Sequence, residues 1–144
     1  KNVVLIHAYE NDGRGPGTIQ DVLTICRERS SSVKQISFHK GYNNCMVGSF
    51  ILSRKENYAC DALIADLLEK FGSSVMVFEN ISAVSIVGEG INDRPDTLIE
   101  LIKAMKESGV ALSGFHTSSF RISFLIDTED LEKSLNILHK YCAG

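Results

Sequence analysis

The amino-acid sequence predicts an α+β fold of two small modules, each an antiparallel sheet with helices on one face. Two observations support this prediction. Apolar residues alternate with strand-like and helix-like periods, and one pattern of strand, turn and helix occurs twice. In residues 83–109 the strand ends at Gly88 and Gly90, and a helix follows Pro95. The earlier copy has Pro16, Thr18, Val22, Cys26 and Val33 in place of Pro95, Thr97, Leu101, Met105 and Leu112.

The first half, residues 1–80, predicts the order β-α-β-β-α-β, which is the split βαβ or ferredoxin-like order. We expect strands at 1–9, 33–38, 45–52 and 74–79, and helices at 18–29 and between Asn57 and Gly72. Thr18 and Asp21 form a candidate capping pair, and Asn57 is placed to cap the second helix. A polar, glycine-rich loop at residues 10–17 separates the first strand from its helix.

The second half, residues 81–144, predicts strands at 81–87, 110–116 and 120–126, a helix after Pro95 and a last helix after Asp127. Its fourth strand is missing or is shared with the first half. Because the chain starts on an apolar strand with no initiator Met, we expect it to be part of a longer protein. The predicted core comprises Val4, Ile6, Val22, Ile36, Leu63, Leu67, Val84, Ile86, Leu101, Ile122, Phe124 and Leu135.

Composition excludes several classes of function. The 144 residues are 44% apolar and 23% charged, and no apolar run approaches the ~18 residues of a membrane span, so we expect a cytoplasmic protein without a membrane partner. A net charge of -3 and a pI near 5.8 argue against nucleic-acid binding. The four cysteines and four histidines lack metal-ligand spacing, and the chain has neither a G-x-S-x-G motif nor a Walker A loop. We therefore expect no catalytic set, metal or cofactor in this chain.

Several motifs of the second half resemble one known family. They are VSIVG at 84–88, Pro95, FHTSS at 115–119, RISF at 121–124 and a closing helix at 131–139. This series is similar to the second ACT module of aspartate kinases, whose usual form is V-S-V-V-G-x-G-M, a helix, I-S-T-S, K-I-S-V and an L-x-x-L-H helix. The first half resembles the first ACT module in layout, with weaker residue matches.

The resemblance implies two ACT modules that form the regulatory region of an aspartate kinase, the enzyme that phosphorylates L-aspartate on the route to lysine, threonine and methionine. The catalytic site, with ATP and Mg, is then expected only in a separate N-terminal kinase domain. The family implies feedback control by lysine or threonine, and a homodimer whose modules join side by side into larger sheets. The alternatives are a free-standing double ACT sensor that controls a partner protein, and a dimerisation domain without a ligand.

The resemblance also implies an effector site in the first module. Backbone amides near a helix N-terminus suit a carboxylate, and side-chain or backbone oxygens suit an ammonium. Where the family commonly has an acidic residue, this sequence has Lys34, which would repel an ammonium and so favours threonine over lysine. Pro95-Asp96 replaces the usual Pro-Gly in the second module, which makes the first module the better candidate. The expected effector residues are Asp12, Gly13, Arg14, Gly15, Pro16, Gly17, Thr18, Ile19, Val33, Lys34 and Gln35.

Overall fold

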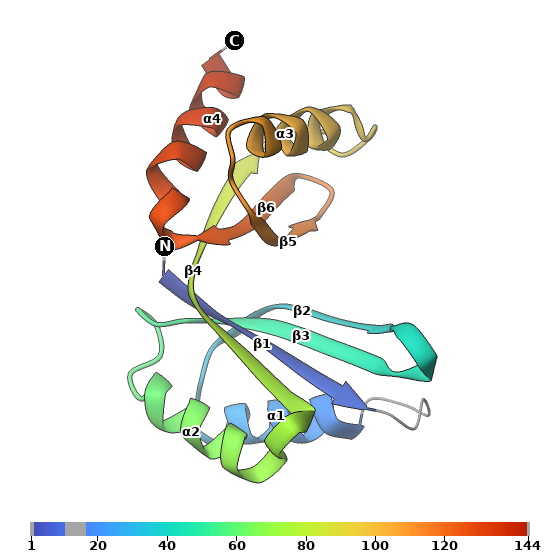
Figure 1. Cartoon of the computed structure of the whole chain (residues 1–144), viewed down its shortest axis with the longest axis vertical. Helices are drawn as coiled ribbons and strands as arrows, with labels where there is room; N and C mark the ends of the chain where they lie inside the picture. Colours follow the sequence, from blue (N-terminus) through green and yellow to red (C-terminus); the bar gives the residue numbers. More distant parts are fainter. Residues whose placement is uncertain (1, 11–16, 144) are drawn as a thin grey trace. The chain divides into compact units, whose positions relative to one another are not determined.

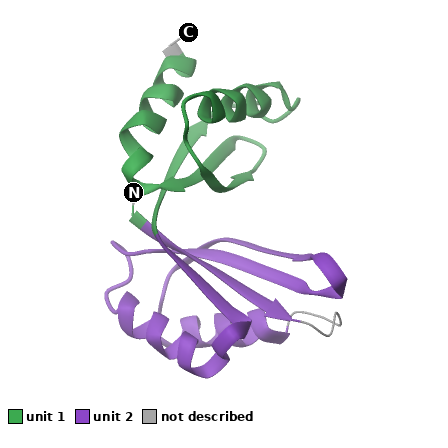
Figure 2. Ribbon diagram, viewed as in Figure 1, with its two compact units in different colours: residues 1–2, 80–144 green, residues 3–79 purple. Residues whose placement is uncertain are grey.

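The computed structural model describes residues 2–10 and 17–143, and its elements follow the predicted order (Figure 1). By their contacts the residues form two units, which we call the first module (Val3–Glu79) and the second module (Lys1–Asn2 with Asn80–Gly144) (Figure 2). The elements are β1 (Asn2–Glu10), α1 (Gly17–Glu28), β2 (Val33–Lys40), β3 (Met46–Ser53), α2 (Cys60–Phe71), β4 (Val75–Val87), α3 (Asp96–Glu107), β5 (Leu112–Thr117), β6 (Arg121–Asp127) and α4 (Leu131–Ala143).

In the first module, the strands lie in the order β2-β3-β1-β4, and α1 and α2 cover one face of the sheet (Figure 1). Strand β3 runs antiparallel to both β1 and β2, and Leu52 stands opposite Val4 on one side and Val33 on the other. Every second strand residue therefore points toward the helices, where Val4, Ile6 and Leu52 are fully buried. The strand order and the single helical layer confirm the ferredoxin-like prediction.

The second module has the order β4-β6-β5 among the described strands, with α3 and α4 packed against them (Figure 1). Val84 stands opposite Phe124, and Ile86 stands opposite Ile122. These side chains form a second core together with Leu101, Met105 and Leu138 from the two helices. Each module therefore has its own hydrophobic core, as the repeat in the sequence indicates.

Strand β4 differs from the prediction of two separate strands at 74–79 and 81–87. It is one element of 13 residues that continues from the first module into the second. Asn80, in the middle of β4, has φ of 58°. Asparagine tolerates this left-handed conformation better than other residues with a side chain, so the strand accommodates a local distortion without ending.

Two predicted core residues are wrong, because Ile36 is 50% exposed and Leu135 is 49% exposed. Ile36 lies on β2, the outermost strand, directly after a bulge in which Gln35 has φ of 53°. In α4, buried Ser134 and Leu138 define the inward face. Leu135 lies about 100° around the helix from Ser134, and so reaches the edge of that face.

The capping predictions also need correction. Helix α2 begins at Cys60, and Asn57 lies three residues earlier with only 5% of its surface exposed. The Asn57 amide accepts a hydrogen bond from the Ser32 backbone N–H at 2.8 Å and donates to the carbonyl oxygens of Ser32 (3.2 Å) and Ser53 (2.8 Å). Asn57 thus ties two loops together instead of capping a helix.

Candidate functional site

The first turn of α1 carries the described part of the predicted effector loop. Residues 12–16 lie outside the described residues, whereas Gly17, Thr18 and Ile19 begin the helix. Ile19 is 5% exposed and packs against β3 at Gly48, where an added Cβ would lie 2.6 Å from Ile19 Cγ1. Gly48 therefore lets the start of α1 lie close to the sheet, a role for which the sequence carries no local signal.

A carboxylate of the chain itself occupies the start of α1. Oε1 of Glu10, the last residue of β1, accepts hydrogen bonds from the Thr18 backbone N–H at 3.0 Å and from Thr18 Oγ1 at 2.9 Å. The expected pairing of Thr18 with Asp21 is replaced by this contact. Because the first N–H groups of a helix have no intrahelical acceptor, Glu10 acts as the cap. Sequence reasoning placed Glu10 in the loop and missed this role.

The other predicted site residues lie at the opposite end of the module. Gly48, next to Ile19, pairs with Phe38, whereas Val33 pairs with Leu52, four residues further along β3. Four residues of a strand span about 13 Å. Val33, Lys34 and Gln35 are therefore not brought next to the start of α1 within one module.

The pairing of β2 with β3 determines which face of the sheet Lys34 occupies. Lys34 pairs with Ile51 of β3. Successive side chains of a strand point to opposite faces, and the next residue, Leu52, points toward the helices. Ile51 and its partner Lys34 therefore lie on the sheet face away from α1. The Nζ of Lys34 lies 2.5 Å from Glu56 Oε2 in a partly exposed ion pair. The argument that Lys34 repels a ligand ammonium therefore has no support in the geometry of a single module.

A shallow apolar groove runs between α1 and the outer strand β2. Its volume is about 630 Å³, which is in the range of small-molecule sites. Ile36 and Phe38 contribute exposed apolar surface from β2. The lining residues are Ile19, Gln20, Leu23, Thr24, Arg27, Ile36 and Phe38.

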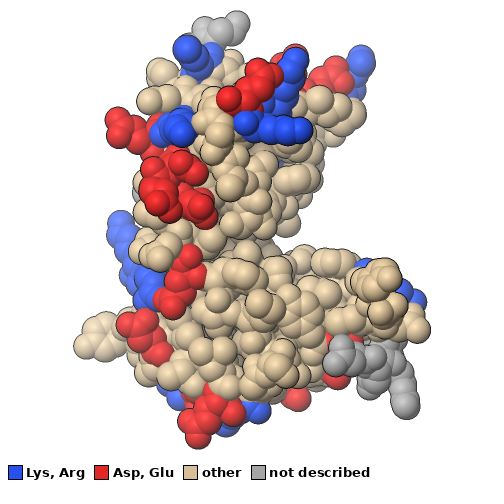
Figure 3. All heavy atoms as spheres, in the orientation of Figure 1, with Lys and Arg blue, Asp and Glu red and all other residues tan. Residues whose placement is uncertain are grey.

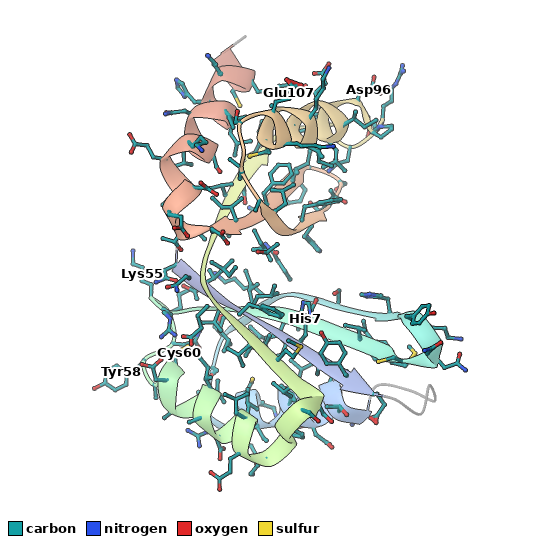
Figure 4. All side chains as sticks on the ribbon, viewed as in Figure 1. His7, Lys55, Tyr58, Cys60, Asp96 and Glu107 are labelled. Atoms are coloured by element: carbon teal, nitrogen blue, oxygen red, sulfur yellow. The ribbon has the colours of Figure 1, made fainter. Side chains whose placement is uncertain are left out.

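A histidine lies on the face of this sheet opposite the helices (Figure 4). His7 Nδ1 is 3.2 Å from Tyr9 Oη, and its ring centroid is 5.1 Å from that of Phe78. Burial, and secondarily the nearby His39, lowers the pKa of His7. These contacts and the lowered pKa are typical of a histidine packed against neighbouring rings. Within residues 2–10 and 17–143, no three His, Cys, Asp or Glu side chains lie close enough together to bind a metal ion.

The cysteines differ in burial, and the charged side chains are of both signs. All four cysteines are unpaired, and burial raises the pKa of Cys26 to about 11. Basic and acidic side chains are interspersed on the face seen in Figure 3. None of the helices that the structure describes is long and apolar enough to cross a membrane.

Comparison with known proteins shows two similarities in sequence. Residues 84–141 match the ACT domain family. The chain is 27% identical over 127 residues, 87% of its length, to an aspartokinase of Thermus thermophilus, and covers 31% of that protein. It spans less than a third of the aspartokinases that it matches.

Solved structures agree with this relation over both modules. The regulatory subunit of aspartate kinase from Thermus flavus has a TM-score of 0.77 at 22% identity, with 96% of this chain and 92% of that one covered. E. coli aspartokinase III, solved in complex with lysine and aspartate, has a TM-score of 0.73 at 18% identity, with 97% of this chain and 31% of that one covered. These likenesses establish the shared fold, and the sequence matches establish the relation. Residues 84–141 therefore match the ACT domain family, and the chain as a whole is similar to the regulatory ACT region of aspartate kinases.

Proposed function

We propose that this region binds an amino acid and thereby sets the activity of an aspartate kinase domain that precedes it in the parent protein. The relation to an aspartokinase over 87% of the chain carries this proposal. The lysine complex of E. coli aspartokinase III supports an amino-acid effector, and we consider lysine and threonine the main candidates. Binding of ATP and Mg, and phosphorylation of aspartate in the cytoplasm, would belong to the kinase domain.

The effector site is proposed at the start of α1. Backbone amides of the predicted effector loop would bind the α-carboxylate, and the apolar groove along α1 would accept the side chain of the effector. Val33, Lys34 and Gln35 lie too far away to reach this point in one module. They could contribute only from a second copy.

A homodimer through β2 would supply that second copy. Strand β2 is the outermost strand of the first module, so its free edge is available for pairing. If two β2 strands pair antiparallel across a two-fold axis, residues 33–35 of one copy lie beside residues 38–40 of the other, near the start of α1. The same contact would cover the exposed Ile36 and Phe38.

Calorimetric titration with each of the twenty amino acids at millimolar concentration tests the proposal. We expect one amino acid to bind, and Thr18→Val to weaken binding roughly three- to tenfold through loss of a hydroxyl that borders the site. Thr97→Val is the matched control, because Thr97 has the equivalent place at the start of α3. If no amino acid binds, the dimerisation domain without a ligand becomes the better interpretation. If one binds but a kinase domain does not precede the region in its gene, the free-standing sensor is favoured.

A further inference from the structure

The last residues of β4 lie at an open edge of the second module's sheet. The Gly88 N–H donates to the carbonyl oxygen of Phe120, directly before β6, at 2.8 Å. Because the N–H groups of a strand point to its two sides in alternation, those of Ser85 and Val87 point away from β6. Among the described strands only β1 lies on that side of β4, and from Val3 onward β1 belongs to the first module. The edge at Ser85 and Val87 is therefore open to a further strand.

A groove follows this edge, between β4 and α4. Its volume is about 490 Å³. Strand β4 contributes Ser85, Ile86 and Val87 to its lining, and α4 contributes Leu135 and Leu138. Val87 is 59% exposed and Leu135 is 49% exposed. The groove thus combines an open backbone edge with uncovered apolar side chains, the two features to which an extended apolar segment binds.

The first module shows what covers the equivalent helical position. Helix α2 begins at Cys60 and α4 begins at Leu131, so Ile64 and Leu135 each stand four residues after the start of their helix. Ile64 is 7% exposed, and its core cluster includes Val75 of β4, the outer strand of that module. The second module has no corresponding outer strand among its described elements. The exposure of Leu135 is therefore what the absence of that strand would leave.

We propose that the segment of the parent protein directly N-terminal to this region adds to β4 as the fourth strand of the second module. Strand β1 begins at Asn2, which groups with the second module, and continues in the first module, whereas β4 runs from the first module into the second. These neighbouring strands are therefore antiparallel, and a backward continuation of β1 follows β4 toward Val87. About six residues of extended chain span that distance.

The position also determines the chemistry of the added segment. Its backbone carbonyl oxygens accept the N–H groups of Ser85 and Val87. Its side chains alternate between the two faces of the sheet, so every second residue lies beside Ile86, faces α4 and is apolar, covering Leu135. The inference rests on the proposed function in one respect, namely that the parent protein continues upstream of this region.

Hydrogen exchange, measured by NMR on two versions of the chain, tests the inference. One version is the 144-residue chain, and the other is extended by about ten of the residues that its gene encodes upstream, enough for a strand and a short lead-in. We expect the amides of Ser85 and Val87 to exchange at least about tenfold more slowly in the extended chain. The amide of Ile86, which points toward β6, and the amides of β5, at the other edge of the sheet, are the controls. A proline in the middle of the extension should abolish the protection.

A substitution in the groove gives a second measurement. Leu135→Ala should lower the urea midpoint of the extended chain more than that of the 144-residue chain, because only the added strand covers this side chain. Leu68→Ala is the matched control, since Leu68 lies on α2 with 43% exposure and should have the same effect in both versions. Thermal melts establish that all compared variants are folded.

The outcomes separate the inference from the proposed function. Equal exchange of Ser85 and Val87 in the two versions, or a gene that encodes no residues upstream, would overturn the inference. Protection that appears in the 144-residue chain and grows with its concentration would assign the edge to a second copy, which also overturns it. Protection that requires the extension supports the inference whether or not any of the twenty amino acids binds.

Discussion

His7 is a single residue through which pH should act on stability. It is half-buried beside Tyr9 and Phe78, and burial, with a smaller effect of His39, lowers its pKa from 6.5. The folded protein therefore binds fewer protons at this site than the unfolded chain does. The corresponding stability is fully present above about pH 6.5 and is lost as the pH falls through the lowered pKa.

Replacement of His7 tests this linkage. We expect His7→Gln to make the free energy of unfolding less dependent on pH below about pH 6.5, because glutamine cannot take up the proton. Urea melts at several pH values measure that dependence. His139→Gln, at an exposed position on α4, is the control and should retain the wild-type slope. An unchanged slope in His7→Gln would contradict the assigned cause.

Single polar residues were also the hardest to predict. Asn57 stands three residues before a helix and Glu10 seven residues before one, and both positions suit a loop residue. Their actual partners are distant in sequence, since Glu10 binds Thr18 eight residues away and Asn57 binds Ser32 25 residues away. Local spacing carries no signal for such contacts. The sequence thus predicted where α1 begins, but not that Glu10 binds Thr18 there.

Among the elements, the helices provide a direct test of which face is buried. Leu101 on α3 is fully buried, whereas Leu135 on α4 is 49% exposed. We expect Leu101→Ala to lower the free energy of unfolding by about 2 to 5 kcal/mol, because it leaves a cavity in the core of the second module. Leu135→Ala is the matched control and should cost less than about 1 kcal/mol. Urea melts that give similar losses for both would show that the helix phase is wrong.

The helices and most strands were predictable because their apolar periods are long and end at glycine or proline. Helix α1 illustrates this, since Ile19, Val22 and Cys26 are buried at the expected spacing. Strand β2 illustrates the limit of the method. Its bulge at Gln35 shifts the facing pattern within the strand, and glutamine is not a residue that marks a left-handed position.

At the scale of the molecule, the internal repeat predicted two modules, and each one has its own core. The division by contacts falls between Glu79 and Asn80, inside the continuous strand β4. Strand β4 belongs to both modules, and Asn80 at the boundary is a residue type that often ends a strand, so the sequence could not show that the two predicted strands are one. The placement of residues 33–35 relative to the loop also depended on strand register, which periodicity alone does not determine.

The last prediction concerns the oligomeric state. In the proposed site, only a second copy would bring residues 33–35 next to the start of α1. We expect a homodimer at tens of micromolar protein in sedimentation velocity, joined through the outer strand β2 of the first module. Phe38→Lys places a charge on the exposed edge next to the groove and should weaken the dimer roughly tenfold or more. Phe115→Lys is the matched control, because Phe115 lies on β5, the outer strand of the second module, with 49% exposure. A monomeric wild type would contradict the dimer, and dissociation caused by Phe115→Lys alone would assign the contact to the other edge.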